Sequence, residues 1–164
     1  MARLSALIMI SIGLFACAAP PRTVQEFREE SKNGGAATRT ERQVVDRPFL
    51  VVFQDIRDNA TKCLNTKAAV PTSGDPGVRK ELVRYRSYTK KTSSKSAEMV
   101  LQADKPGSGS MPQGGYYTLL ADIEAVAAQK TAVTISGPSM LYGDVFDAVA
   151  EWAKGKARIC PSLP

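Results

Sequence analysis

Apolar side chains recur at three- and four-residue spacing in two stretches of the chain, and this period predicts two amphipathic helices. The first covers residues 46–64, with Asp46 as its cap and Pro48 in its first turn, where the missing N–H costs nothing. The second begins at Ser139 or Asp144, either of which can cap it. The two predicted helices thus enclose the middle of the chain.

Between these helices, four runs have the composition of β-strands, and two of them alternate apolar and polar residues. The four runs cover residues 81–89, 97–103, 116–127 and 131–136. Alternation gives a strand one face for a core and one face for water. Part of the third run, residues 120–128, is also good helix material. The alternation begins earlier, at Tyr116, so we interpret the whole run as a strand.

The links between these elements indicate how the strands connect. Residues 90–96 and 129–130 are short enough to form hairpins, so neighbouring runs are expected to pair antiparallel. Residues 71–77 and 104–115 are rich in Gly, Pro and Ser, which predicts loops, the longer of them mobile. The predicted fold class is α+β: a four-stranded antiparallel meander with an N-terminal and a C-terminal helix packed on one face, in a single domain over residues 47–164.

The N-terminus has the layout of an export signal. Arg3 precedes an apolar run, Leu4 to Ala16, that is too short to span a bilayer as a helix. The run ends in Leu14-Phe15-Ala16-Cys17, which resembles the lipobox of bacterial lipoproteins. The alternative is an ordinary signal peptide that is cleaved after an Ala-x-Ala site between Ala16 and Ala19.

The resemblance to lipoproteins has consequences for processing and location. It implies that residues 1–16 are a signal peptide, that Cys17 is acylated and becomes the first residue, and that this lipid holds the protein on a membrane. Ala18 stands where an Asp would favour retention in the inner membrane. The resemblance therefore implies lipid anchoring in the outer membrane, with the protein facing the periplasm.

Residues 17–46 separate the acylated position from the predicted domain. They contain prolines, glycines and polar residues, and no apolar period that would bury a face. This composition predicts a disordered tether, which fully extended would reach about 100 Å. The alternative for one part of it is a short strand around residues 43–45.

With Cys17 used for the lipid, Cys63 and Cys160 are the remaining cysteines. In an oxidising compartment an even pair predicts a disulfide, here between the end of the first helix and the segment after the second. The chain has no histidine. This excludes Cys/His and Ser/His/Asp catalytic sites and every metal site that needs histidine. We expect no metal, and no cofactor other than the covalent lipid.

The basic residues are concentrated in one segment. The chain has 22 lysines and arginines against 16 acids, and seven of these bases lie in residues 79–95 with a single acid, Glu81. Two-residue spacing places guanidinium groups and a tyrosine on one strand face, where they can bind phosphate or carboxylate. The predicted anion- or partner-binding residues are Arg84, Arg86, Tyr88, Lys90 and Lys91. The alternative is an edge strand that its charges protect against aggregation.

These observations favour a membrane-anchored lipoprotein that acts as a non-catalytic binding or envelope-assembly module. Its expected partners are the membrane, through the lipid, and an envelope protein or an anionic envelope polymer or lipid; nucleic acid is not expected. The alternative function is hydrolysis of an envelope glycan by Asp122, Glu124 or Asp144. Asp122 and Glu124 lie on the outer face of a predicted strand, and Asp144 lies near a predicted helix start, where a negative charge is favourable. These positions explain the acids structurally, so the sequence does not favour an enzyme.

Overall fold

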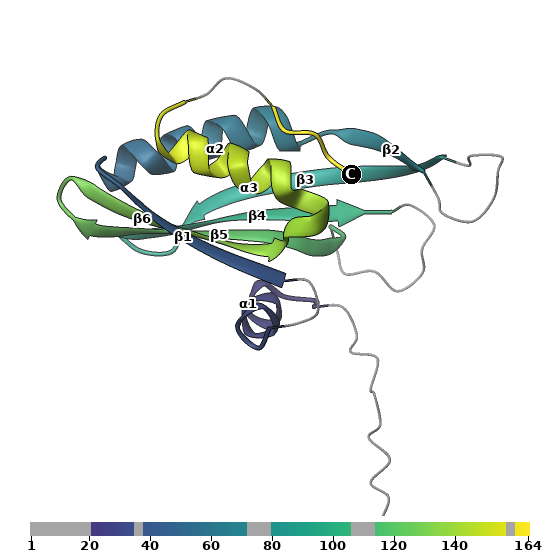
Figure 1. Ribbon diagram of the computed structural model, residues 1–164, viewed down its shortest axis with the longest axis horizontal. Helices are drawn as coiled ribbons and strands as arrows, with labels where there is room; N and C mark the ends of the chain where they lie inside the picture. Colours follow the sequence, from purple (N-terminus) through teal and green to yellow (C-terminus); the bar gives the residue numbers. More distant parts are fainter. Residues whose placement is uncertain (1–20, 35–37, 72–79, 106–113, 157–159) are drawn as a thin grey trace, which may run out of the picture.

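The computed structural model describes residues 21–34, 38–71, 80–105, 114–156 and 160–164 (Figure 1). In this part of the chain, three helices and six strands follow one another in the order α1 (Val24–Lys32), β1 (Thr38–Val45), α2 (Phe49–Leu64), β2 (Lys67–Pro71), β3 (Lys80–Lys91), β4 (Ser96–Asp104), β5 (Tyr116–Ala127), β6 (Lys130–Pro138) and α3 (Ser139–Ala153). The fold class is α+β, as the sequence predicts.

The strands form one antiparallel sheet in the order β1-β6-β5-β4-β3-β2. Its centre, β3 to β6, is the predicted meander. The predicted count of four strands is wrong, because β2 pairs with β3 and β1 pairs with β6. Neither added strand shows the alternation on which the strand predictions rely: β1 is mostly polar, and β2 is five residues long. Their pairing depends on backbone hydrogen bonds, which leave no mark in the sequence.

The prediction of a disordered tether over residues 17–46 is wrong for the part of it that the structure describes. α1 begins after Thr23, whose hydroxyl oxygen accepts a 3.1 Å hydrogen bond from the N–H of Glu26, and its buried residue is Phe27. β1 pairs with β6 along its length and places Val45 in the core. One buried side chain per element is too few to produce an apolar period, and the folded domain therefore begins earlier than predicted.

α2 and α3 pack against each other on one face of the sheet, as predicted, whereas α1 lies on the opposite face (Figure 1). The starts of the two longer helices differ from the prediction. Each follows a proline, Pro48 or Pro138, and neither has a side-chain cap. In α2 the carbonyl oxygen of Pro48 accepts hydrogen bonds of 3.1 Å from the N–H groups of Val51 and Val52, so the first turn closes without a side-chain cap. The predicted caps Asp46, Ser139 and Asp144 therefore do not serve as caps.

The main core fills the space between the sheet and the two longer helices. Its largest fully buried side chains include Trp152 of α3, Ile56 of α2 and Leu101 of β4. These apolar faces are the ones that the helical period and the strand alternation predict.

A second, smaller core lies under α1. Phe27 packs there on Val100 of β4 and Leu120 of β5. β4 is thus buried on both faces. The prediction that its polar face meets water is wrong for Glu98 and Gln102, which are 5% and 6% exposed.

The predicted disulfide between Cys63 and Cys160 is present, with Cα atoms 5.0 Å apart and a separation of 97 residues along the chain. It ties the last turn of α2 to the segment that follows α3. The hydroxyl of Tyr85 in β3 donates a 2.7 Å hydrogen bond to the carbonyl oxygen of Pro164. Residues 160–164 are therefore fixed at both ends across the helical layer.

The two predicted hairpins are confirmed, because β3 pairs with β4 and β5 pairs with β6. The predicted loops at residues 71–77 and 104–115 fall largely on residues 72–79 and 106–113, which lie outside the described residues. The signal peptide and the acylated Cys17 lie outside them as well.

Candidate functional site

The strand that holds the predicted binding residues, β3, has two different faces. Val83 and Tyr85 point into the main core beneath α2 and α3. Because neighbouring side chains alternate along a strand, the even-numbered positions lie on the opposite face, the one that bears α1. We call this set the β3 stripe; it consists of Lys80, Leu82, Arg84, Arg86, Tyr88 and Lys90.

Four of the five predicted binding residues belong to the β3 stripe. The expectation that Arg84, Arg86 and Tyr88 share one strand face is therefore confirmed. The fifth residue, Lys91, lies on the other face, where its ammonium is 5.4 Å from the centre of the Phe53 ring in α2. This cation–π contact gives Lys91 a structural role that is separate from the stripe.

The β3 stripe is left open because α1 covers only part of its face of the sheet. α1 packs mainly against β1, β5 and β6. Leu82 is 49% exposed and Tyr88 is 36% exposed, which are high values for large side chains in a sheet. Burial, and to a lesser degree the nearby Tyr117, raises the pKa of Tyr88 above its ordinary value. The phenol thus remains neutral and offers both a ring and a hydroxyl group.

The cations of the β3 stripe differ in their partners. Arg84 Nη1 lies 3.9 Å from a carboxylate oxygen of Asp104, and Lys90 Nζ lies 3.1 Å from one of Glu98. Lys80 and Arg86 have no ion-pair partner among the described residues. Arg86, at the middle of the stripe, can therefore bind an external carboxylate or phosphate without first losing an internal one.

A polar groove of about 560 Å³ lies between α1 and the sheet. Arg28 of α1 reaches into it, with Nη2 2.7 Å from Asp122 Oδ1 and 3.2 Å from Glu98 Oε2. Lys90 holds the other oxygen of Glu98. The hydrogen bond to Asp122 is the main cause that raises the pKa of Arg28, against the opposing effect of burial. Arg28 thus fastens α1 to β4 and β5 through two carboxylates.

Sequence reasoning missed Arg28 and Glu98. Arg28 falls within the predicted tether, where no side chain was expected to have a partner. Glu98 was placed on a face open to water. One signal was available for Glu98: it is opposite Lys90 in the β3–β4 hairpin, and a carboxylate directly across from an ammonium is a favourable cross-strand pair.

The carboxylates of the hydrolase alternative do not form one site. Asp122 and Glu124 line the groove beside α1, whereas Asp144 belongs to α3 on the opposite face of the sheet. Both oxygens of Asp122 accept hydrogen bonds from Arg28, at 2.7 and 3.4 Å. A carboxylate that is held in this way is a poor candidate for moving protons or attacking a substrate.

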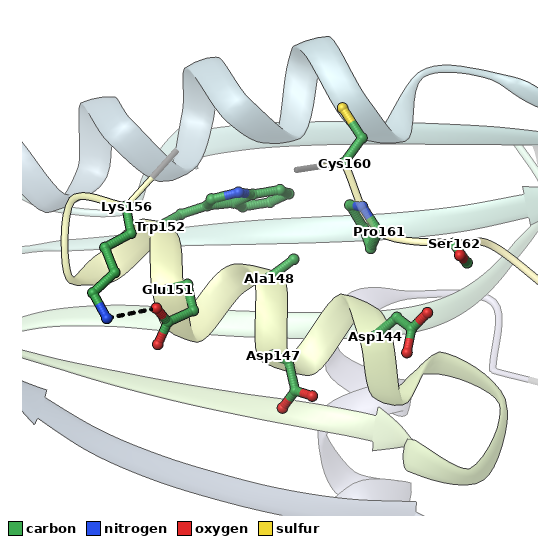
Figure 2. Close-up of a pocket in the computed structure, with 9 residues that line it drawn as sticks. All are labelled: Asp144, Asp147, Ala148, Glu151, Trp152, Lys156, Cys160, Pro161 and Ser162. Carbon is green, nitrogen blue, oxygen red and sulfur yellow. Dashed lines mark ion pairs between the residues drawn. The ribbon is translucent and has the colours of Figure 1, made fainter. Parts of the chain in front are cut away.

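A second groove, of about 490 Å³, runs between α3 and the segment that holds Cys160 (Figure 2). Its floor includes Trp152, which is 1% exposed. Asp144 and Asp147 point away from Trp152 (Figure 2). Hydrogen bonds from Lys154 and then from Lys156 lower the pKa of Glu151 below its ordinary range. Asp144 and Asp147 thus belong to the solvent-exposed face of α3, and Glu151 forms exposed ion pairs with Lys154 and Lys156. These positions explain the acids structurally.

Among the described residues, no three cysteine or acidic side chains gather in an arrangement that could hold a metal ion. None of the helices in that part of the chain is long and apolar enough to cross a membrane.

Comparisons with known proteins give no family. The chain matches no protein-family model and no curated protein sequence. Among solved structures it is similar to the crystal structure of the hypothetical protein jhp0584 from Helicobacter pylori, with a TM-score of 0.46 and 13% sequence identity over 79% of this chain and 94% of that chain. A likeness at this level carries no conclusion about function.

Proposed function

We propose that this chain is a bacterial lipoprotein, held on the outer membrane by a lipid on Cys17, that acts as a non-catalytic binding or assembly module in the periplasm. Its contact surface in this proposal is the β3 stripe, and its partner is anionic. The observation that carries the proposal is the open position of the stripe, where Arg86 has no ion-pair partner among the described residues and Tyr88 lies exposed beside it.

The chemistry of the stripe supports an anionic partner. A guanidinium group binds carboxylate or phosphate through two parallel hydrogen bonds, and a neutral phenol adds ring contact and one more hydrogen bond. Arg84, on one side of this pair, lies 3.9 Å from Asp104 near the surface, where such ion pairs are weak and easily exchanged. Lys90, on the other side, pairs with the buried carboxylate of Glu98 and keeps that partner. The stripe can therefore present Lys80, Arg84 and Arg86 to one partner.

The anchor is proposed from the residues Leu14 to Cys17, and the position of α1 limits how far the domain can lie from it. The separation from Cys17 to Val24, the first residue of α1, is 24 − 17 = 7 residues. Such a stretch reaches about 25 Å when fully extended. The domain would thus work close to the membrane, in contrast to the reach of about 100 Å that a tether over residues 17–46 would give.

Photocrosslinking in cells tests this proposal. A photoreactive residue in place of Leu82, within the stripe, is expected to give an adduct in the envelope, and the same residue in place of Leu50 at the start of α2 serves as the positional control. Both side chains are about half exposed in the parent, at 49% and 50%.

Charge reversal then shows whether the stripe is responsible. Arg86→Glu should abolish the Leu82 adduct, whereas Lys62→Glu, an equal charge change on the exposed face of α2, should leave it intact. Adducts that survive Arg86→Glu, or that disappear equally in both variants, would contradict the role of the stripe.

A further inference from the structure

We infer that the anionic partner of the β3 stripe is α1 of a second copy of this chain. The inference rests on the proposed function for the role of the stripe as a binding surface. It adds three properties of the described residues: the width of the open part of the sheet, the charge of α1, and the register between α1 and the stripe.

The open part of the sheet, over β3 and β2, has room for a second helix. α1 lies over β1, β6 and β5. β6, the middle one of these three strands, is three strands from β3, and neighbouring strands are about 4.8 Å apart, so the middle of α1 lies about 14 Å from β3. Packed helices lie about 8 to 10 Å apart. A second helix therefore has room over β3 beside α1.

The outer surface of α1 has the charge that the stripe requires. Its exposed acids are Glu26, Glu29 and Glu30. None of the three has an ion-pair partner among the described residues. The exposed bases are Arg22, ahead of the helix, and Lys32 in its last turn, so the middle of α1 is acidic. Arg28 points inward to the sheet.

The register of the sheet places α1 and the stripe at the same level along the strands. Phe27, in the middle of α1, packs on Val100 of β4. Val100 is the direct partner of Tyr88 in β3. Tyr88 lies in turn between Arg86 and Lys90 in the stripe. The buried anchor of α1 and the aromatic side chain of the stripe therefore occupy one row of the sheet.

This alignment fits a symmetric dimer in which two sheets face each other across a two-fold axis parallel to the strands. It would place the α1 of each copy over Tyr88 of the other, with Glu29 near Arg86 in two equivalent contacts. The exposed Leu82 and Tyr88 would be covered in the same step. The starts of both α1 helices would lie at one level along the axis, so that both lipids on Cys17 could enter one membrane leaflet.

Sedimentation equilibrium of the full chain in mild detergent tests the inference. We expect the parent to be a dimer, and we expect Glu29→Arg and Arg86→Glu each to weaken its self-association at least about tenfold, because each change sets like charges against each other in both contacts. Two lipidated chains can share one micelle, so a dimer alone is not sufficient. The matched controls are Asp147→Arg on α3 and Lys62→Glu on α2, which make the same charge changes on the opposite face and should leave the dimer unchanged.

An equimolar mixture of Glu29→Arg and Arg86→Glu gives the decisive result. In a mixed dimer the arginine introduced at position 29 of one copy would face the glutamate introduced at position 86 of the other. The second contact would join the native Arg86 to the native Glu29, so both contacts become attractive. The mixture should recover dimers that neither variant forms alone. The inference would be overturned by a monomeric parent, by a parent dimer whose self-association neither substitution weakens, or by a mixture that stays monomeric.

The outcome separates this inference from the proposed function. If the parent is monomeric while Leu82 crosslinks to a different envelope molecule in a manner that depends on Arg86, the binding module stands and the second copy is not its partner. If Cys17 carries no lipid but the charge pattern of the dimer holds, the anchor fails and the inferred dimer stands.

Discussion

Removing the bridge between Cys63 and Cys160 should lower the free energy of unfolding by about 3 to 5 kcal/mol. The bridge closes a loop with a separation of 97 residues, which encloses β2 to β6 and α3. In the chain-entropy description, closing a loop of that length restricts the unfolded state by about 4.7 kcal/mol at 25 °C. Part of this gain can be lost to structure that remains in the unfolded chain, hence the range.

Urea unfolding of the Cys63→Ala/Cys160→Ala variant measures this effect. With a slope of about 2 kcal/mol per molar urea, the midpoint should fall by roughly 2 M. The parent treated with reductant should unfold at the same midpoint as the variant, and reductant should not affect the variant. A loss below about 1 kcal/mol, with slopes unchanged, would refute the loop-closure explanation, since two ordinary surface substitutions, at up to about 0.5 kcal/mol each, already cost that amount.

Three further predictions concern the backbone, the tyrosines and α1. Gly115 has a φ of 101°, and a Cβ at this position would clash with a backbone carbonyl of β4. Gly115→Ala should therefore lower the free energy of unfolding, measured in urea, by about 2 to 4 kcal/mol. Gly34 has a φ of 66° and open space around it, so Gly34→Ala should cost only about 1 kcal/mol. Burial, followed by the neighbouring Tyr85, raises the pKa of Tyr142 above its unfolded value of about 10, so the folded state keeps a proton that the unfolded state loses. The stability that Tyr142 contributes should therefore be constant below about pH 10 and fall as the pH rises above it, and Tyr142→Phe should reduce that fall in urea midpoints measured from pH 8 to 11. Phe27→Ala should speed hydrogen exchange of the α1 amides at least about tenfold while the amides of β4 and β5 keep their protection, because Phe27 is the buried residue of α1.

The sequence predicted the elements that bury a continuous apolar face. α2 and α3 have several buried side chains at helical spacing, and the four central strands have alternation or hairpin links, so local pattern and tertiary packing agree. The disulfide followed from cysteine count and compartment. In each of these cases the residues themselves supply the period or the pairing that the prediction used.

The elements that the sequence missed are held by few side chains. α1 depends on Phe27 and Arg28, and β1 on backbone pairing together with Val45. Such contacts join residues that are far apart in the chain: Arg28 and Asp122 are 94 residues apart. No local window contains both partners, which is why the segment looked like a tether and why the polar face of β4 was expected to meet water.

The sequence predicted which residues of the candidate site lie together on β3, but not which of them stay open to solvent. Two-residue spacing on β3 correctly grouped Arg84, Arg86 and Tyr88, because side chains alternate strictly along a strand. Spacing alone could not show that α1 stops short of β3 and leaves this group open. It also could not show that Lys91, one residue beyond the stripe, lies over Phe53 instead.

Mass spectrometry of the N-terminal peptide from the mature protein, purified from envelopes, tests whether Cys17 is the acylated first residue. We expect a peptide that begins at Cys17 and carries the mass of a covalent lipid, and we expect Cys17→Ser to remove both the lipid and this cleavage. A peptide that begins within Ala16 to Ala19 without lipid, or one that retains the apolar run from Leu4, would contradict the proposed lipid anchor.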